Sequence, residues 1–164
     1  MTIQLIITGG TFDKRYDEIG GELTLDQTHL PKLLDEVRCT LDVAIELNQL
    51  IDSLEMDSVH RASVVNSCRS CAPERIVITH GTDTMVETAQ QIAKAGLAKT
   101  IVLTGAMRPW SFVHSDATFN LGTALAAVQT LPHGVWIAMN GQLFAHDAVK
   151  KNRAEGIFEA TETE

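Results

Sequence analysis

Short apolar runs that each end in a polar segment constrain the fold of this chain more than any other feature. The clearest runs are Ile76–Thr79, Thr100–Leu103 and Val135–Met139. Longer segments that suit helices lie between them, over 84–95 and 119–130. Strands that alternate with helices in this way predict βαβ units and a largely parallel sheet.

The rest of the chain extends the same pattern. Strands are expected at Ile3–Thr8 and, with weaker alternation, at Leu41–Leu47, and helices over 30–37 and 59–68. Phe144–Val149 is expected to form an irregular strand or one arm of a hairpin. The 164 residues suit one domain. We predict a single α/β domain over residues 1–156 with a mostly parallel, doubly wound sheet, then a polar acidic tail at 157–164 whose composition suggests disorder.

Charge and hydropathy exclude two classes of partner. The formal net charge is −8, which argues against nucleic-acid binding because phosphate neutralisation needs clustered Lys and Arg. No apolar run approaches the roughly 20 residues of a membrane helix. The chain has no recognisable secretory signal and three cysteines, an odd number. A reducing compartment, the cytoplasm, is therefore expected.

The sequence predicts neither a metal nor a cofactor. Cys68 and Cys71 have C-x-x-C spacing, but a zinc site would need two more ligands nearby. We interpret the pair as incidental thiols, with a redox pair as the alternative. A Rossmann fingerprint after the first strand and a Walker A motif are both missing, which argues against nucleotide binding.

Polar segments follow four of the predicted strands. They are Gly9–Thr11, His80–Thr84, Gly105–Pro109 and Asn140–Gly141. Ligands bind beyond the carboxyl ends of the strands in an open parallel sheet, and glycine allows close approach of the backbone. These four segments are therefore expected to converge on one edge of the sheet.

Two hydroxyl groups in these segments are candidate nucleophiles. Thr11 follows two glycines, although Gly9–Thr11 alone is also typical of a simple tight turn. Thr82 and Asp83 lie where a helix begins, a position at which Thr and Asp often act as caps. Thr84 and Glu87 have the spacing of a capping box, which leaves Thr82 and Asp83 free for chemistry. A threonine hydroxyl needs a base or an electrostatic partner to attack an amide.

Three of the segments together resemble the signature segments of the L-asparaginase family. They are Thr-Gly-Gly-Thr at 8–11, His-Gly-Thr-Asp-Thr-Met at 80–85 and Gly-Ala-Met-Arg-Pro at 105–109. In addition, 147–152 resembles the segment that carries the family's active-site lysine. The resemblance runs from Ile3 to about Asn152 and corresponds to the family's N-terminal domain. It implies that the C-terminal domain, which completes a neighbouring subunit's active site, is absent here.

The resemblance implies a catalytic role for five residues. Thr11 would be the primary nucleophile and form an acyl-enzyme, while Lys150 and Asp83 would polarise Thr82 or an activated water. Tyr16, the only tyrosine in the chain, would correspond to the family's loop tyrosine. By pattern alone, Lys150 is typical of a surface residue and Tyr16 of a loop aromatic.

The resemblance also implies the residues that bind substrate. Ser53 would bind the substrate α-carboxylate, with Asp52 beside it. Asp83 would hold the α-ammonium group, and Gly81 would also bind the substrate. Ala106 and Met107 would line the site near the scissile amide through their backbone. Leu54 stands where family members often carry a glutamine, so that contact is either lost or replaced, with Glu55 as the candidate replacement.

The resulting prediction is an L-asparaginase, a hydrolase of linear amides that converts L-asparagine to L-aspartate and ammonia. It would act as a homodimer or larger homo-oligomer and without a cofactor. Glutaminase or broader amidase activity is one alternative, because an extra methylene changes discrimination by only about 1–3 kcal/mol. A noncatalytic amino-acid-binding or regulatory relative is the other.

Overall fold

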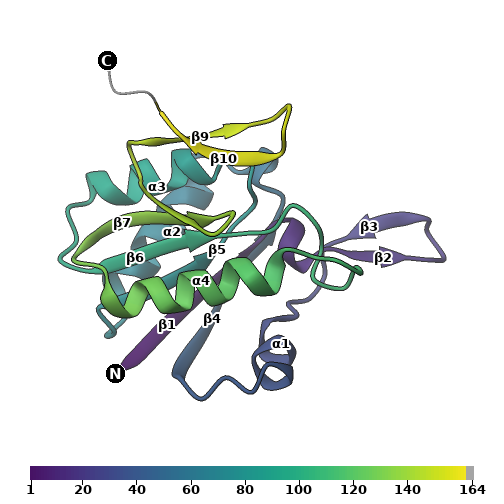
Figure 1. Cartoon of the computed structure of the whole chain (residues 1–164), viewed down its shortest axis with the longest axis horizontal. Helices are drawn as coiled ribbons and strands as arrows, with labels where there is room; N and C mark the ends of the chain where they lie inside the picture. Colours follow the sequence, from purple (N-terminus) through teal and green to yellow (C-terminus); the bar gives the residue numbers. More distant parts are fainter. Residues whose placement is uncertain (162–164) are drawn as a thin grey trace.

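A six-stranded sheet forms the centre of the computed structural model, which describes residues 1–161 (Figure 1). The strand order is β4-β1-β5-β6-β7-β8. Strands β4, β1, β5, β6 and β7 are parallel, and β8 pairs antiparallel with β7. The bounds are β1 (Thr2–Gly9), β4 (Asp42–Ile51), β5 (Arg75–Thr79), β6 (Thr100–Thr104), β7 (Gly134–Met139) and β8 (Gln142–Ala145). The predicted mostly parallel α/β sheet is confirmed.

Helices cover both faces of the sheet, as expected of a doubly wound fold. The helices are α1 (Leu30–Glu36), α2 (Ser58–Ser70), α3 (Met85–Lys94) and α4 (Ala117–Thr130). Side chains of α2 and α3 pack in one hydrophobic core with Ile76 and Ile78, whereas those of α1 and α4 pack in a second core with Val77. Because both faces are buried, the strands read as continuous apolar runs rather than as alternating ones. Among residues 1–161, no helix combines the length and apolarity that a membrane span requires.

The order of the strands places a switch point between β1 and β5. The chain runs from β1 outward to β4 and then returns past β1 to β5. Ligands bind at such a reversal, beyond the carboxyl ends of the strands. The segment that follows β1 contains Thr11, and the segment that follows β5 contains Thr82 and Asp83. The fold therefore puts the predicted hydroxyls at its natural ligand-binding edge.

One predicted helix start differs from the structure. The Thr84 hydroxyl does not cap α3 but donates to the carbonyl oxygen of Ser53 at 2.8 Å. Glu87 instead pairs with Arg61 of α2 at 3.2 Å. The capping-box prediction is therefore wrong, because contacts with a neighbouring loop and helix replace the local ones. These contacts join the start of α3 to the loop that follows β4.

Two hairpins lie outside the main sheet. Strands β2 (Arg15–Asp17) and β3 (Glu22–Thr24) project from the body of the molecule, and β9 (Val149–Asn152) pairs antiparallel with β10 (Ile157–Ala160) (Figure 1). The single irregular strand expected at 144–149 is instead divided between β8 and β9. Residues 157–160 form a strand rather than a disordered tail, because Phe158 is buried in the core and its N–H donates to Asn140 Oδ1 at 2.7 Å. Residues 162–164 of that expected tail lie outside the described residues.

Candidate active site

Backbone contacts between glycines bring the predicted segments together. A Cβ atom on Gly10 would lie 2.5 Å from the Cα of Gly81, and one on Gly81 would lie 2.5 Å from Ser53 Oγ. Real Cβ atoms do not approach so closely, so these loops can pack against one another only with glycine at both positions. Thr11 and Thr82 each directly follow one of the two glycines. Three segments far apart in the sequence therefore meet at one edge of the sheet.

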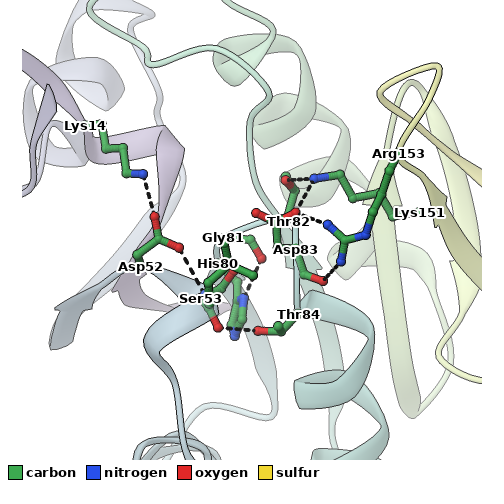
Figure 2. A network of polar contacts seen from close by, with 11 residues as sticks. Lys14, Asp52, Ser53, His80, Gly81, Thr82, Asp83, Thr84, Lys151 and Arg153 are labelled. Carbon is green, nitrogen blue, oxygen red and sulfur yellow. Dashed lines mark hydrogen bonds and ion pairs between the residues drawn. The ribbon is translucent and has the colours of Figure 1, made fainter.

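A lysine, a carboxylate and a hydroxyl form the chemical centre of this edge (Figure 2). Lys151 Nζ donates to Thr82 Oγ1 at 2.8 Å and to Asp83 Oδ1 at 2.9 Å. The Thr82 side chain is buried, and only 10% of the Lys151 side chain is exposed. Hydrogen bonds from Lys151 and then Arg153 hold the pKa of Asp83 below its usual value. Asp83 is therefore an anion at neutral pH, and Lys151 is the group placed to exchange a proton with Thr82.

Lys150, the lysine predicted from the sequence, lies elsewhere. Its side chain is 57% exposed and its Nζ lies 3.4 Å from Glu159 of β10. Successive side chains in a strand point to opposite faces, so only one of the two adjacent lysines in β9 can reach Thr82. The structure gives that place to Lys151, and the prediction of Lys150 is wrong by one position.

Thr11 and Tyr16 have different surroundings. Thr11 begins the 3₁₀-helix η1 (Thr11–Asp13) directly beyond β1 and is half-buried. Tyr16 is exposed and lies opposite Leu23 in the projecting β2–β3 hairpin. Within residues 1–161, no hydrogen bond joins the Tyr16 side chain to either threonine. The structure thus brings Thr11 to the site and leaves Tyr16 on a separate hairpin.

The 3₁₀-helix η2 (Ser53–Glu55) begins at Ser53, and Asp52 is its N-cap residue. Ser53 Oγ is buried and has no hydrogen-bond partner among the described residues, so its hydroxyl is available to a ligand or a water. Asp52 is already occupied, because it accepts from Leu54 N at 3.0 Å and pairs with Lys14 Nζ at 2.6 Å. The contact with Lys14 lowers the pKa of Asp52. Asp52 therefore fixes the loop, whereas the Ser53 hydroxyl has no hydrogen-bond partner among the described residues.

The loop after β6 is held by two side chains that the sequence did not single out. Asp116 accepts from Met107 N at 2.9 Å, and Asn120 Nδ2 donates to the carbonyl oxygen of Gly105 at 2.9 Å. Ala106 lies between these anchors and is fully buried. Its methyl group therefore belongs to the core, and its backbone is the part that can face a ligand. No sequence signal marked Asp116 or Asn120, because each acts through a tertiary contact.

His80 and Arg153 are further residues that sequence reasoning missed. His80 is completely buried and its Nδ1 lies 2.8 Å from the Gly81 carbonyl oxygen. Because a carbonyl only accepts, Nδ1 carries the proton, and burial lowers the pKa of His80 to about 4. Arg153 binds the Asp83 carboxylate and also donates to the Asp83 carbonyl oxygen at 3.1 Å. His80 lies within one of the signature segments, which could have drawn attention to it. Nothing in the sequence marked Arg153 as a site residue except its position two residues after Lys151.

Two hollows on the surface lie away from these groups. The larger, about 700 Å³, is at the amino ends of β1 and β5 and is lined by Thr2, Gln4 and Arg75 among others. The smaller, about 330 Å³, is lined by Lys94 and Asp147 among others. Neither joins the loops at the carboxyl ends of the strands. Chemistry and topology, not the size of a hollow, therefore identify the candidate site.

Comparisons with known proteins show which family model matches the chain and which solved structures share its fold. The family model described as "Asparaginase, N-terminal" matches residues 2–162. The chain is 32% identical over 151 residues to a subunit of the glutamyl-tRNA(Gln) amidotransferase of Aeropyrum pernix, covering 85% of this chain and 35% of the relative. It is 28% identical over 162 residues to a glutaminase-asparaginase of Pseudomonas aeruginosa, covering 90% and 45%. The thermostable L-asparaginase from Thermococcus kodakarensis has a similar structure, with a TM-score of 0.84, 26% identity and coverage of 98% and 51%.

Proposed function

Because the chain belongs to the asparaginase family, whose N-terminal domain it matches, we propose that it hydrolyses the side-chain amide of L-asparagine to L-aspartate and ammonia. The observation that carries the proposal is the contact of Lys151 with Thr82 and Asp83, next to the loop that holds Thr11. The chain spans about half the length or less of the relatives it matches. The activity of the whole protein is therefore part of the proposal.

The proposed reaction has two steps. The Thr11 hydroxyl attacks the amide carbon, the carbon–nitrogen bond breaks, and nitrogen leaves as ammonia with the hydroxyl proton. A water then attacks the resulting ester, gives its hydroxyl to the carbonyl carbon and returns a proton to Thr11. Lys151 and Asp83 polarise Thr82 or this water through their shared hydrogen bonds. No cofactor takes part in either step.

The binding of the substrate is proposed from the same contacts. Ser53 Oγ, which is buried without a partner among residues 1–161, binds the α-carboxylate. Asp83 attracts the α-ammonium group, and the backbone of Gly81 and Ala106 lines the position of the amide. Tyr16 takes its expected catalytic role only if the β2–β3 hairpin folds toward Thr11, and we propose that it does so when substrate is bound.

Replacement of Thr11 tests whether the chain is an enzyme. We expect Thr11→Ala to reduce ammonia release from asparagine by at least about 10³-fold, because the nucleophile is lost. The matched control is Thr123→Ala in α4, whose hydroxyl bonds only its own helix among the described residues and whose loss should leave turnover unchanged. Circular dichroism should show an unaltered fold for both variants. Equal turnover of Thr11→Ala and the original chain would show that Thr11 is not the nucleophile, whereas no turnover by either protein would favour the noncatalytic amino-acid-binding alternative.

Glutamine is the second candidate substrate. One relative is named a glutaminase-asparaginase, and a methylene group changes discrimination by only about 1–3 kcal/mol. Parallel ammonia assays on asparagine and glutamine decide between the two substrates. A higher kcat/KM for glutamine would replace the asparaginase proposal with a glutaminase one.

Compartment and assembly complete the proposal. All three cysteines are free thiols, which suits the reducing conditions of the cytoplasm. A homodimer or larger homo-oligomer is proposed by analogy with the family alone. Gel filtration of the purified chain measures the assembly directly.

A further inference from the structure

The carboxylate of Asp83 is shared by two cations. Lys151 Nζ lies 2.9 Å from Oδ1, and the Arg153 guanidinium binds the same oxygen. Arg153 also reaches the Asp83 backbone, where Nη2 donates to the carbonyl oxygen at 3.1 Å. Figure 2 shows the side chains of Lys151, in β9, and of Arg153, directly after β9, extending toward Asp83. One negative charge is thus surrounded by two positive charges.

The two cations differ in how firmly they are held. The Lys151 side chain is 10% exposed and also bonds Thr82, whereas 61% of the Arg153 side chain is exposed. Lys151 is therefore fixed within the chemical centre, and Arg153 approaches from the solvent. Arg153 makes no contact with Thr82 that would give it a part in proton transfer.

The two cations at Asp83 affect which substrate can bind there. A substrate α-ammonium group is expected to bind Asp83, but it must compete there with Arg153 and is repelled by it. The other acid nearby, Asp52, is paired with Lys14 at 2.6 Å. The pair of Lys14 and Asp52 is neutral, whereas Lys151 and Arg153 together exceed the charge of Asp83 by one. This local positive charge at Asp83 favours a substrate with net negative charge over a zwitterion.

We propose that Arg153 determines substrate specificity. It occupies the Asp83 carboxylate, which is expected to receive the substrate ammonium group. The activity thereby extends to monoamides of dicarboxylic acids that lack an α-amino group. The proposal rests on the proposed amide hydrolysis and names its substrate class more closely. Succinamic acid represents this class, because it differs from asparagine only by the missing α-amino group. Its hydrolysis is the same reaction, in which water and the amide give a carboxylate and ammonia.

The test compares asparagine and succinamic acid in two arginine variants. Arg153→Gln removes the positive charge beside Asp83, and its exposed position protects the fold. Arg69→Gln is the matched control, because Arg69 is an exposed residue of α2 whose side chain bonds only Asn66 within residues 1–161. The kcat/KM of each variant is measured for both amides.

We expect the original chain to hydrolyse both amides with kcat/KM values within about tenfold of each other. Arg153→Gln should raise the preference for asparagine about two- to fivefold, the effect of one partly exposed ion pair. Arg69→Gln should leave the preference unchanged. An Arg153→Gln variant with the original preference, or with both rates changed equally, would overturn the proposal.

A binding measurement separates this proposal from the proposed activity. L-Aspartate and succinate differ by the same amino group, and isothermal titration with each ligand needs no turnover. If neither amide is hydrolysed, the hydrolase proposal fails, yet a shift toward aspartate in Arg153→Gln still supports the role of Arg153. An unchanged aspartate-to-succinate ratio, or no binding of either ligand by any variant, contradicts it.

Discussion

Lys150 and Lys151 are adjacent residues of β9 with opposite surroundings. Lys151 is almost fully covered and bonds Thr82 and Asp83, whereas Lys150 is largely exposed and faces Glu159 on the neighbouring strand. The two residues have the same side chain and nearly the same backbone position. Any difference between them in function therefore arises from the face of the strand to which each belongs.

This pair gives a prediction at the scale of the residue. We expect Lys151→Met to lower kcat for ammonia release by about 10²- to 10⁴-fold, the usual contribution of a group that assists proton transfer. Lys150→Met should change kcat by less than about twofold, because an exposed ion pair contributes little. Steady-state assays of the two variants, with thermal melts to confirm folding, measure the difference. The reverse order of activities would restore Lys150 as the active-site lysine.

The junction between β1 and β5 is the decisive feature at the scale of elements. The segment after β1 touches the segment after β5 through Gly10 and Gly81, and Gly10 has a φ of +81°. Gly10 therefore meets two demands, an extended backbone with positive φ, which residues with a side chain rarely adopt, and the absence of a side chain. The second demand exists only because the two strands are neighbours in the sheet.

Alanine substitutions can separate these two demands. Gly96 also has a positive φ, +61°, but a Cβ atom there would meet nothing within 4 Å. We expect Gly96→Ala to lower the free energy of unfolding by about 1 kcal/mol, the cost of the backbone conformation. Gly10→Ala should add about 1–3 kcal/mol for overpacking and should also reduce turnover. Urea denaturation compares the variants, and equal losses would mean that the contact with Gly81 is unimportant.

For the molecule as a whole, the buried side chain of His80 makes the free energy of unfolding depend on pH in the acid range. His80 lies under the segment that carries Thr82, and burial lowers its pKa from 6.5 to about 4. Below pH 6.5 the unfolded chain takes up a proton at His80, while the folded chain stays neutral there until about pH 4. The unfolded state is therefore increasingly favoured as the pH falls through this window.

The expected loss is about 3 kcal/mol of unfolding free energy between pH 6.5 and 4. Asp13 acts in the opposite direction, because burial raises its pKa, so the variants must be compared with the original chain. Urea denaturation at several pH values should give a flatter profile for His80→Gln. His133→Gln, which removes a largely exposed histidine, should retain the original slope. Parallel profiles for all three proteins would contradict the role of His80.

Local sequence patterns predicted the α/β class, the places of the main strands and the segments that carry Thr11, Thr82 and Asp83. They did so because buried strands need continuous apolar runs and close backbone approach needs glycine, and both are visible in the local sequence. The segment with Ser53 was predicted from the family resemblance alone. Tertiary structure decided which lysine reaches Thr82, that Thr84 bonds Ser53 rather than capping its helix, and that residues 157–160 form a strand. It also placed Arg153 on Asp83. Each of these features depends on strand register or on a partner far away in the chain. The spacing of neighbouring residues predicts neither the register nor the distant partner.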